Sequence, residues 1–154
     1  MVNTYSPKRL VCSIAGQKLS GFSDTDIVTV ALDEDQFIKY IGADGEVSRS
    51  FNPAISGSFT FTLAQTSRAN QILSAIFLAD IADNTGNLVV PVIVRDMNSS
   101  DTFYIGAQCW IRKMPDSAFN KEIDSREWII DCDKILFNIS GNGESFLQGI
   151  LPGI

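Results

Sequence analysis

The chain of 154 residues contains no histidine, and this absence removes several kinds of chemistry at once. Histidine is the commonest general base and a frequent zinc ligand, so the usual catalytic triad and histidine-based zinc sites are excluded. Phosphate loops, nucleotide fingerprints and nucleophile elbows are also missing from the sequence. We therefore predict a protein that is not an enzyme and that binds no cofactor and no metal.

Acidic pairs are the remaining candidates for chemistry. Asp-x-Asp spacing occurs at Asp24 and Asp26, at Asp33 and Asp35, and at Asp131 and Asp133. Such pairs share one face of a strand, but none has the further oxygen ligands and the glycine of a calcium loop. We interpret them as solvated surface, and a hydrolase with two close carboxylates stays an alternative.

Cysteine is scarce, and none of the three residues lies in a C-x-x-C pair. They are Cys12, Cys109 and Cys132. We favour three reduced thiols that pack as small apolar groups. A disulfide within or between chains is an alternative, and a metal site is a weaker one, because three scattered thiols without histidine make a poor ligand set.

Basic residues are too few for a nucleic-acid binder. The chain has 12 lysines and arginines against 18 aspartates and glutamates, a formal net charge of −6. Such a surface repels a phosphate backbone rather than gripping it. The first residues lack the pattern of a signal peptide, and no apolar run approaches the about 20 residues that span a bilayer. We expect a protein that is made in a cytoplasm and does not insert into membranes.

The sequence does contain a change of hydrophobic period between residues 57 and 81. Three large apolar side chains alternate with three small polar ones, Phe59, Phe61 and Leu63 against Ser58, Thr60 and Thr62. This two-residue period predicts a strand with one buried face. After Ser67, a predicted N-cap, the apolar spacing becomes helical and predicts a helix over residues 67–83.

Strand patterns fill most of the remaining chain, at residues 10–15, 18–22, 27–32, 36–41, 88–94, 102–114 and 123–137. The run 88–94 is almost continuously apolar, which predicts a strand buried on both faces, with Pro91 at an edge or a bulge. The run 102–114 predicts a face with Phe103, Ile105, Ala107, Cys109 and Ile111, opposite a face with Tyr104, Gln108, Trp110 and Arg112. In the last run, Trp128, Ile130, Cys132 and Lys134 share a face.

These patterns predict a fold that is mainly β with one α-helix. The architecture we expect is a β-sandwich or open β-barrel of about eight strands flanked by one helix. The length suits one domain. We divide the chain into an arm at residues 1–9, a β domain at 10–138 and a C-terminal tail at 139–154.

Two segments stand apart from the strands. Residues 42–56 form a long polar extension that begins with a strong Asp-Gly turn signal, and we expect either an ordered arm or a mobile loop. The tail is rich in glycine but keeps apolar side chains at Phe146, Leu147, Ile150 and Leu151. A disordered tail is normally poor in such groups, so the tail should pack on its own domain or on another subunit.

Three segments together carry a family resemblance: residues 41–50 (IGADGEVSRS), 63–75 (LAQTSRANQILSA) and 119–128 (FNKEIDSREW). Their order and spacing resemble the tube proteins of contractile bacteriophage tails, a group long labelled only as a domain of unknown function. The resemblance spans residues 5–138. It implies a fold related to the tube protein of type VI secretion, a β-barrel or sandwich with one flanking helix.

The resemblance also implies a structural role in the virion. Six copies would form a hexameric ring, and rings would stack into the inner tail tube through which DNA passes to the host without specific binding. Further partners would be the tail sheath, the tape measure and baseplate or neck proteins, with assembly in the host cytoplasm. By position, the candidate inter-subunit residues are Gly42, Asp44, Gly45, Glu46, Arg49 and Phe51 in the loop, and Phe146, Leu147, Ile150 and Leu151 in the tail.

The candidate lumen face is Ser58, Thr60 and Thr62, whose small neutral side chains would make a smooth wall. Six copies at −6 each would carry −36 formal charges, so we expect a lumen that is net negative. The alternatives are a secretion-type tube component and a ligand-binding β-sandwich such as a carbohydrate-binding module. Exposure of Trp110 and Trp128 on one flat platform would favour the latter, and their burial would favour the tube.

Overall fold

The computed structural model describes residues 4–22, 27–83, 85–98 and 102–140, and within them the chain forms one long sheet, one separate hairpin and one α-helix. In chain order the elements are η1 (Pro7–Arg9), β1 (Leu10–Ile14), β2 (Gln17–Lys18), β3 (Val28–Leu32), β4 (Phe37–Ile41), β5 (Val47–Phe51), β6 (Gly57–Ala64), α1 (Ala69–Ala82), β7 (Val90–Asp96), β8 (Phe103–Ile111), β9 (Ser125–Cys132) and β10 (Ile135–Asn138).

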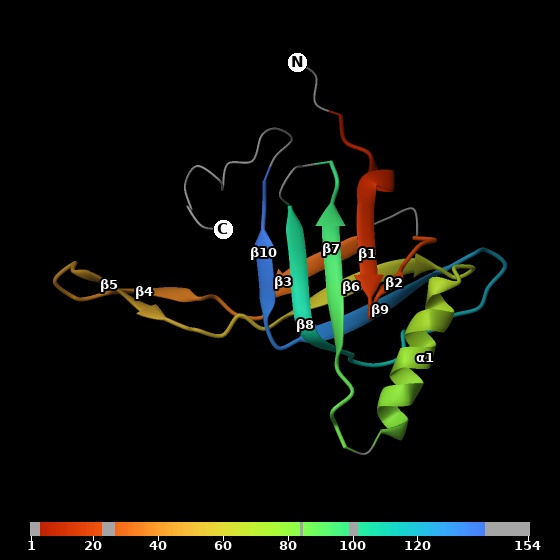
Figure 1. The fold of residues 1–154 in the computed structure, drawn as a ribbon. Coiled ribbons are helices and arrows are strands. Elements are labelled where there is room, and N and C mark those ends of the chain that lie inside the picture. The colour runs from red at the N-terminus through yellow and green to blue at the C-terminus, as the bar shows by residue number, and fades with distance from the viewer. Residues whose placement is uncertain (1–3, 23–26, 84, 99–101, 141–154) are drawn as a thin grey trace.

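The eight-stranded sheet is antiparallel throughout and runs in the order β2-β1-β7-β8-β9-β6-β3, while β10 pairs with β8 beside β9. Strands β4 and β5 pair only with each other and project from one end of the molecule, and α1 lies at the other end (Figure 1). The prediction of a mainly β fold with about eight strands in the sheet and one flanking helix is confirmed.

Strand β6 lies inside the sheet, between β3 and β9, and its alternation works as the sequence predicts. Phe59, Phe61 and Leu63 are fully buried, whereas the residues between them are only half-buried. The rings of Phe59 and Phe61 stack with centroids 6.3 Å apart. Burying a large apolar side chain contributes about 1.5–3 kcal/mol, so this one strand supplies a substantial part of the core energy.

Strand β7 differs from the prediction of burial on both faces. Val92 and Val94 are buried, but Ile93 between them is 41% exposed, so the strand has one core face and one open face. The prediction for Pro91 is confirmed, because the pairing with β8 shifts its register between Val90 and Val92. The bulge lets a residue without an amide hydrogen sit inside a sheet.

Strand β8 corrects the predicted faces. Val90 of β7 pairs with Cys109 of β8, and Val92 of β7 pairs with Gly106 of β8. Two steps along β7 therefore correspond to three along β8, so β8 carries one extra residue at the bulge. The phase therefore changes within the strand. Tyr104 and Gly106 share the core side with Cys109 and Ile111, and the predicted single face through Phe103, Ile105 and Ala107 is wrong.

Two further predicted strands are shorter in the structure. The run 123–137 divides into β9 and β10, and Lys134 lies exposed between them rather than on the face of Trp128 and Ile130. Of the run 18–22 only Lys18 belongs to a strand, the short β2, which follows a turn at Ala15 and Gly16, both with positive φ. The predicted pair Asp24 and Asp26 lies outside the described residues.

Helix α1 spans Ala69–Ala82 and has Arg68 at its cap position, without a capping side-chain bond, so the predicted cap Ser67 lies one residue earlier. Ser67 Oγ accepts a hydrogen bond from the amide of Ala69 at 3.2 Å and donates to the carbonyl of Ser20 at 2.5 Å. The helix buries Ala69 and Leu73 in the core. Trp128 Nε1 of β9 donates to Asn70 Oδ1 at 2.9 Å, which fixes the first turn of the helix against the sheet.

Replacing Ser67 with alanine is expected to lower the free energy of unfolding by about 1 kcal/mol, because the hydrogen bond to the Ala69 amide and the link to Ser20 are both lost. For a chain of this length the loss corresponds to a fall in Tm of about 2–4 °C. Thermal unfolding followed by circular dichroism measures it. Ser20→Ala is the matched control, since Ser20 contributes only its backbone carbonyl, and an equal fall in both variants would contradict the role of the hydroxyl.

Candidate functional site

The hairpin β4–β5 has a rigid base. The amide of Asn52 donates to the carbonyl of Gln36 at 2.6 Å, and Gln36 Nε2 donates to the carbonyl of Ala54 at 2.9 Å. Asn52 Nδ2 also donates to Glu34 Oε2 at 2.6 Å. These contacts hold the start and the end of the hairpin together, so the segment is an ordered projection rather than a mobile loop (Figure 1).

Every residue of β4 and β5 is exposed, although most are apolar. The large exposed side chains are Phe37, Ile38, Tyr40, Ile41, Val47 and Phe51, each more than half exposed. Phe37 lies opposite Phe51, with ring centroids 5.3 Å apart, and the guanidinium of Arg49 lies 4.4 Å from the Phe37 ring centroid. A monomeric protein rarely exposes a contiguous apolar surface of this kind, so the hairpin is a candidate contact surface.

The tip of the hairpin is closed by its own backbone. The amide of Gly42 donates to the carbonyl of Glu46 at 2.8 Å, and Gly45 has a φ of +85°, which favours glycine. Asp44 Oδ1 accepts from the amide of Glu46 at 3.1 Å. Two carboxylates therefore sit at the far end of an apolar projection.

The structure brings the six predicted loop residues onto this hairpin. Gly42, Asp44, Gly45 and Glu46 form the tip, and Arg49 and Phe51 belong to β5. The sequence analysis predicted a strand at residues 36–41, which is β4, but it began the extension only at residue 42 and so did not include this strand in the projection. The signal was present, since Phe37, Ile38, Tyr40 and Ile41 leave neither face of the strand polar.

The three predicted lumen residues lie side by side on the outward face of β6. Ser58 pairs with Ala31 on β3 and with Asp131 on β9, and Thr60 pairs with Thr29 and Ile129. Next to them, Arg112 donates two hydrogen bonds to Asp131, at 2.7 and 2.9 Å, in the single ion pair of the described residues. The outward face is thus mixed polar rather than uniformly neutral.

Strand β3, at one end of the sheet path, and strand β10, which branches from β8, leave a second candidate contact surface. Among the described strands, β3 pairs only with β6, and β10 pairs only with β8. An apolar cavity of about 220 Å³ lies between them, lined by Val30, Ala31, Leu32, Tyr104, Ile135, Phe137 and Ile139. Edge strands beside an apolar cavity are places where another chain can add to a sheet. The predicted tail residues 146–151 lie outside the described residues.

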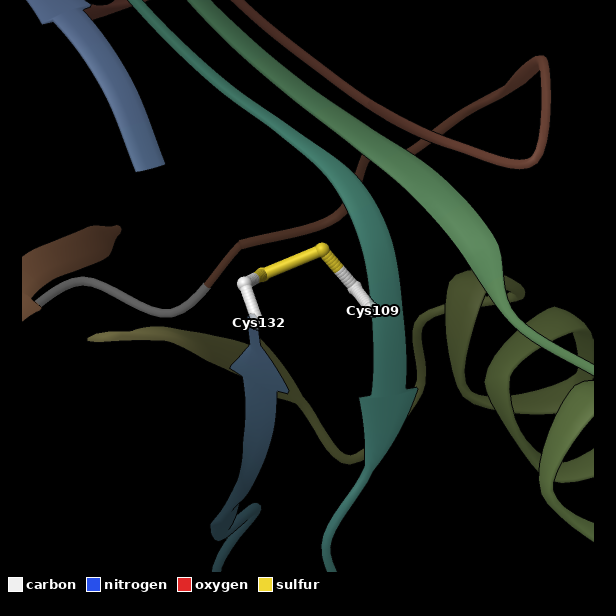
Figure 2. The surroundings of a disulfide bond; sticks show 2 residues. All are labelled: Cys109 and Cys132. Carbon is white, nitrogen blue, oxygen red and sulfur yellow. A yellow bond between two sulfur atoms is a disulfide. The ribbon is translucent and has the colours of Figure 1, made fainter. Parts of the chain in front are cut away.

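The cysteines differ from the favoured prediction of three reduced thiols. Cys109 of β8 and Cys132 of β9 face each other in the sheet and form a disulfide (Figure 2). Gly106 leaves room for it, because a Cβ there would lie 2.5 Å from Cys109 Sγ and 2.6 Å from Cys132 Sγ. The spacing of the residues in the sequence could not reveal this pair, which depends on the register of two strands.

Cys12 remains a free thiol, and burial raises its pKa from 9.0 to about 12. The folded chain therefore keeps a proton that the unfolded chain releases above about pH 9, so the contribution of Cys12 to stability is lost as the pH rises toward 12.

At pH 8 we expect iodoacetamide to leave the native protein unlabelled, and to label one thiol after unfolding without reductant. Mass spectrometry measures this, and rapid labelling of the native chain would contradict it.

The two tryptophans do not form a platform. Trp128 is 3% exposed and points into the core, while Trp110 is 39% exposed on the opposite face. The observation expected of a flat carbohydrate-binding surface is therefore absent from the described residues. Within the same residues, no three histidine, cysteine or acidic side chains could hold a metal ion together, and no helix is long and apolar enough to cross a membrane.

The described residues thus combine an antiparallel sheet, one flanking helix and a protruding hairpin with exposed apolar side chains, which is an architecture without a recognisable catalytic centre. A family model, described as the bacteriophage PhiTE tail tube protein, matches residues 3–140. The chain belongs to this family, and it is a structural protein of the phage tail tube and hence part of the virion tail.

Known proteins support the same placement. A curated relative, structural protein ORF10 of Pseudomonas phage KPP10, is 29% identical over 146 residues, which cover 91% of this chain and 84% of the relative. The tube–sheath complex of an extracellular contractile injection system has a TM-score of 0.58 at 12% identity, over 89% of this chain and 93% of that one. The cap that terminates the anti-feeding prophage tube has a TM-score of 0.56 at 9% identity, over 91% and 94%. These two likenesses show the shared fold.

Proposed function

We propose that six copies of this chain form a ring, that rings stack into the inner tube of a contractile tail, and that phage DNA passes through the lumen without specific binding. The observation that carries the proposal is the hairpin β4–β5, which is hydrogen-bonded at its base and exposes large apolar side chains on both faces. Contiguous exposed apolar surfaces mark sites that another protein covers, because covering them removes apolar area from water. In a tube, the neighbouring subunit provides that cover.

The lumen wall in this proposal is the outward face of β3, β6 and β9. It carries Ser58, Thr60 and Thr62, with Glu127 and Asp131 on the adjoining strand. These residues supply two acids, and Arg112 offsets one of them. A wall that is small, polar and net negative repels the phosphate backbone, and screening over about 8 Å confines the effect to the wall.

The remaining roles follow from assembly. The sheath would surround the tube, the tape measure would occupy it, and baseplate or neck proteins would cap its ends. The tail segment with Phe146, Leu147, Ile150 and Leu151 would add a further inter-subunit contact. Subunits would assemble in the host cytoplasm, and the protein would act mechanically rather than as an enzyme.

Negative-stain electron microscopy of the purified chain tests the proposal. We expect hexameric rings or stacked tubes at concentrations where a simple monomer would stay dispersed. A high-resolution map of such a tube should then show an acidic lumen. A chain that stays monomeric at every concentration, or a tube whose lumen is basic, would contradict the corresponding part of the proposal.

A further inference from the structure

A cavity is lined by residues of the first turns of α1, of β9 and of the neighbouring segments. Helix α1 lies at the end of the molecule opposite the hairpin (Figure 1). The cavity has a volume of about 370 Å³. Its walls come from the helix, from the end of β6, from β9 and from the segment after β8, and they include Gln65, Asn70, Ser117, Phe119 and Arg126. The lining is mixed in polarity: Pro115, Arg126 and Trp128 are buried, whereas Met114, Ser117 and Phe119 are exposed.

Arg126 is the unusual member of this cavity. It is only 7% exposed, and its guanidinium donates to two backbone carbonyls, those of Ser125 at 3.1 Å and Ala118 at 3.2 Å. It also lies 5.3 Å from the ring centroid of Phe119. The described residues supply no carboxylate partner, since their one ion pair is Arg112 with Asp131. Buried charges in proteins are normally paired, so Arg126 lacks the counter-charge that its burial calls for.

Two of the exposed residues that line the cavity are large and apolar. Met114 is 63% exposed and Phe119 is 80% exposed, and both line the cavity. A group that fills this site therefore needs an acidic end to meet Arg126 and apolar flanks to cover these two side chains.

The tip of the hairpin has this chemistry. Asp44 and Glu46 provide the acids, and the carboxylate of Glu46 makes no hydrogen bond within the described part of the chain. The cross-strand pair of Ile41 and Val47 lies directly behind the tip, 60% and 61% exposed.

We propose that the cavity around Arg126 receives the tip of the hairpin from a second copy of this chain, with Asp44 and Glu46 pairing with the guanidinium. The inference rests on the proposed assembly and names the surface that the hairpin occupies. A projection at one end and a receptor at the other make a head-to-tail contact (Figure 1), and such contacts close into rings or continue as filaments. In a two-fold symmetric dimer, by contrast, each copy would fill the cavity of the other, and no further subunit could add.

Cross-linking tests the contact without disturbing Arg126. Ala43→Cys places a thiol at the tip, and Ser117→Cys places one in the cavity wall, both at exposed positions. Assembled protein carrying both changes should give a ladder of covalent oligomers after mild oxidation, while either single variant should not. The control pair, Ala43→Cys with Thr85→Cys at another exposed site, should give none. Tubes that form without a ladder, or an equal ladder from the control pair, would overturn the proposal.

A second experiment uses a variant that lacks only the charges at the tip. Asp44→Asn with Glu46→Gln should raise the critical concentration for assembly at least tenfold, because charge-assisted hydrogen bonds to a buried guanidinium are lost. The control pair, Asp35→Asn with Asp133→Asn, makes the same change in net charge at exposed positions. It should change the critical concentration for assembly by less than twofold. Equal effects from both pairs would contradict the proposal. If tubes require the hairpin but show neither the cross-linked ladder nor any effect of the charges at the tip, this inference is contradicted and the proposed function is not.

Discussion

Replacing residues 37–51 with an Asn-Gly turn is expected to give a folded subunit that no longer forms long tubes. The replacement removes β4 and β5 but keeps Gln36 and Asn52, whose backbones already meet at 2.6 Å. Asn-Gly closes a two-residue turn between such paired residues. No residue of the hairpin belongs to the core, so the free energy of unfolding should change by less than about 1 kcal/mol.

Electron microscopy measures tube formation, and circular dichroism confirms that the subunit is folded. The matched control is Ala43→Ser, which changes the exposed tip without altering its charge or shape and should assemble normally. A narrower deletion of residues 46–55 is a poorer test, because it removes the base contacts of Asn52 and leaves β4 without its partner. Tubes of normal length from the hairpin-free subunit would refute the assembly role of β4–β5.

Phe61→Ala is expected to have the largest effect on stability of any single substitution considered. Phe61 is fully buried, lies opposite Val28 on one side and Trp128 on the other, and stacks on Phe59. Truncating such a ring costs about 3–5 kcal/mol through lost burial and the cavity that remains. The total stability of a domain is only about 5–15 kcal/mol, so the variant should be close to unfolding at physiological temperature.

The urea midpoint of unfolding measures this loss. Thr60→Ala is the matched control on the neighbouring position of β6, where the side chain faces outward and is half-buried. Its cost should stay within about 1 kcal/mol. Similar losses for both variants would mean that the two faces of β6 do not differ in the way that the burial pattern indicates.

The parts of the fold that the sequence predicts well are those where one period holds over a whole element. The residues of β6 alternate without interruption over Gly57–Ala64, and α1 begins shortly after the predicted cap Ser67. The prediction of the two faces of β8 was wrong because one inserted residue shifts the alternation within the strand. Ala107 and Gln108 did not reveal the shift, since they are small or polar enough to suit either face. The run of β7 is apolar at successive positions, and such a run predicts a strand buried on both faces. Nothing in the sequence therefore indicated that Ile93 faces outward.

For the candidate site, sequence patterns located the turn but not the surface. The Asp-Gly signal identified the tip, whereas the exposure of Phe37 and Tyr40 required the structure. Arg126 was missed because arginine is expected at the surface. Its position shares the parity of Trp128 and Ile130, so the inward face of β9 could have revealed its burial. The disulfide of Cys109 and Cys132 depends on strand register, which spacing along the chain does not encode.

The pairing inside the hairpin has a consequence for subunits that have not yet met their neighbours. Lys39 and Arg49 lie directly opposite each other in the middle of a face whose other members are Phe37, Phe51, Ile41 and Val47. Two such faces cannot stack on each other without bringing four cations into an apolar contact, which like-charge repulsion and desolvation oppose. The two cations therefore disfavour association of free subunits through this face of their hairpins, before each hairpin meets its proper partner.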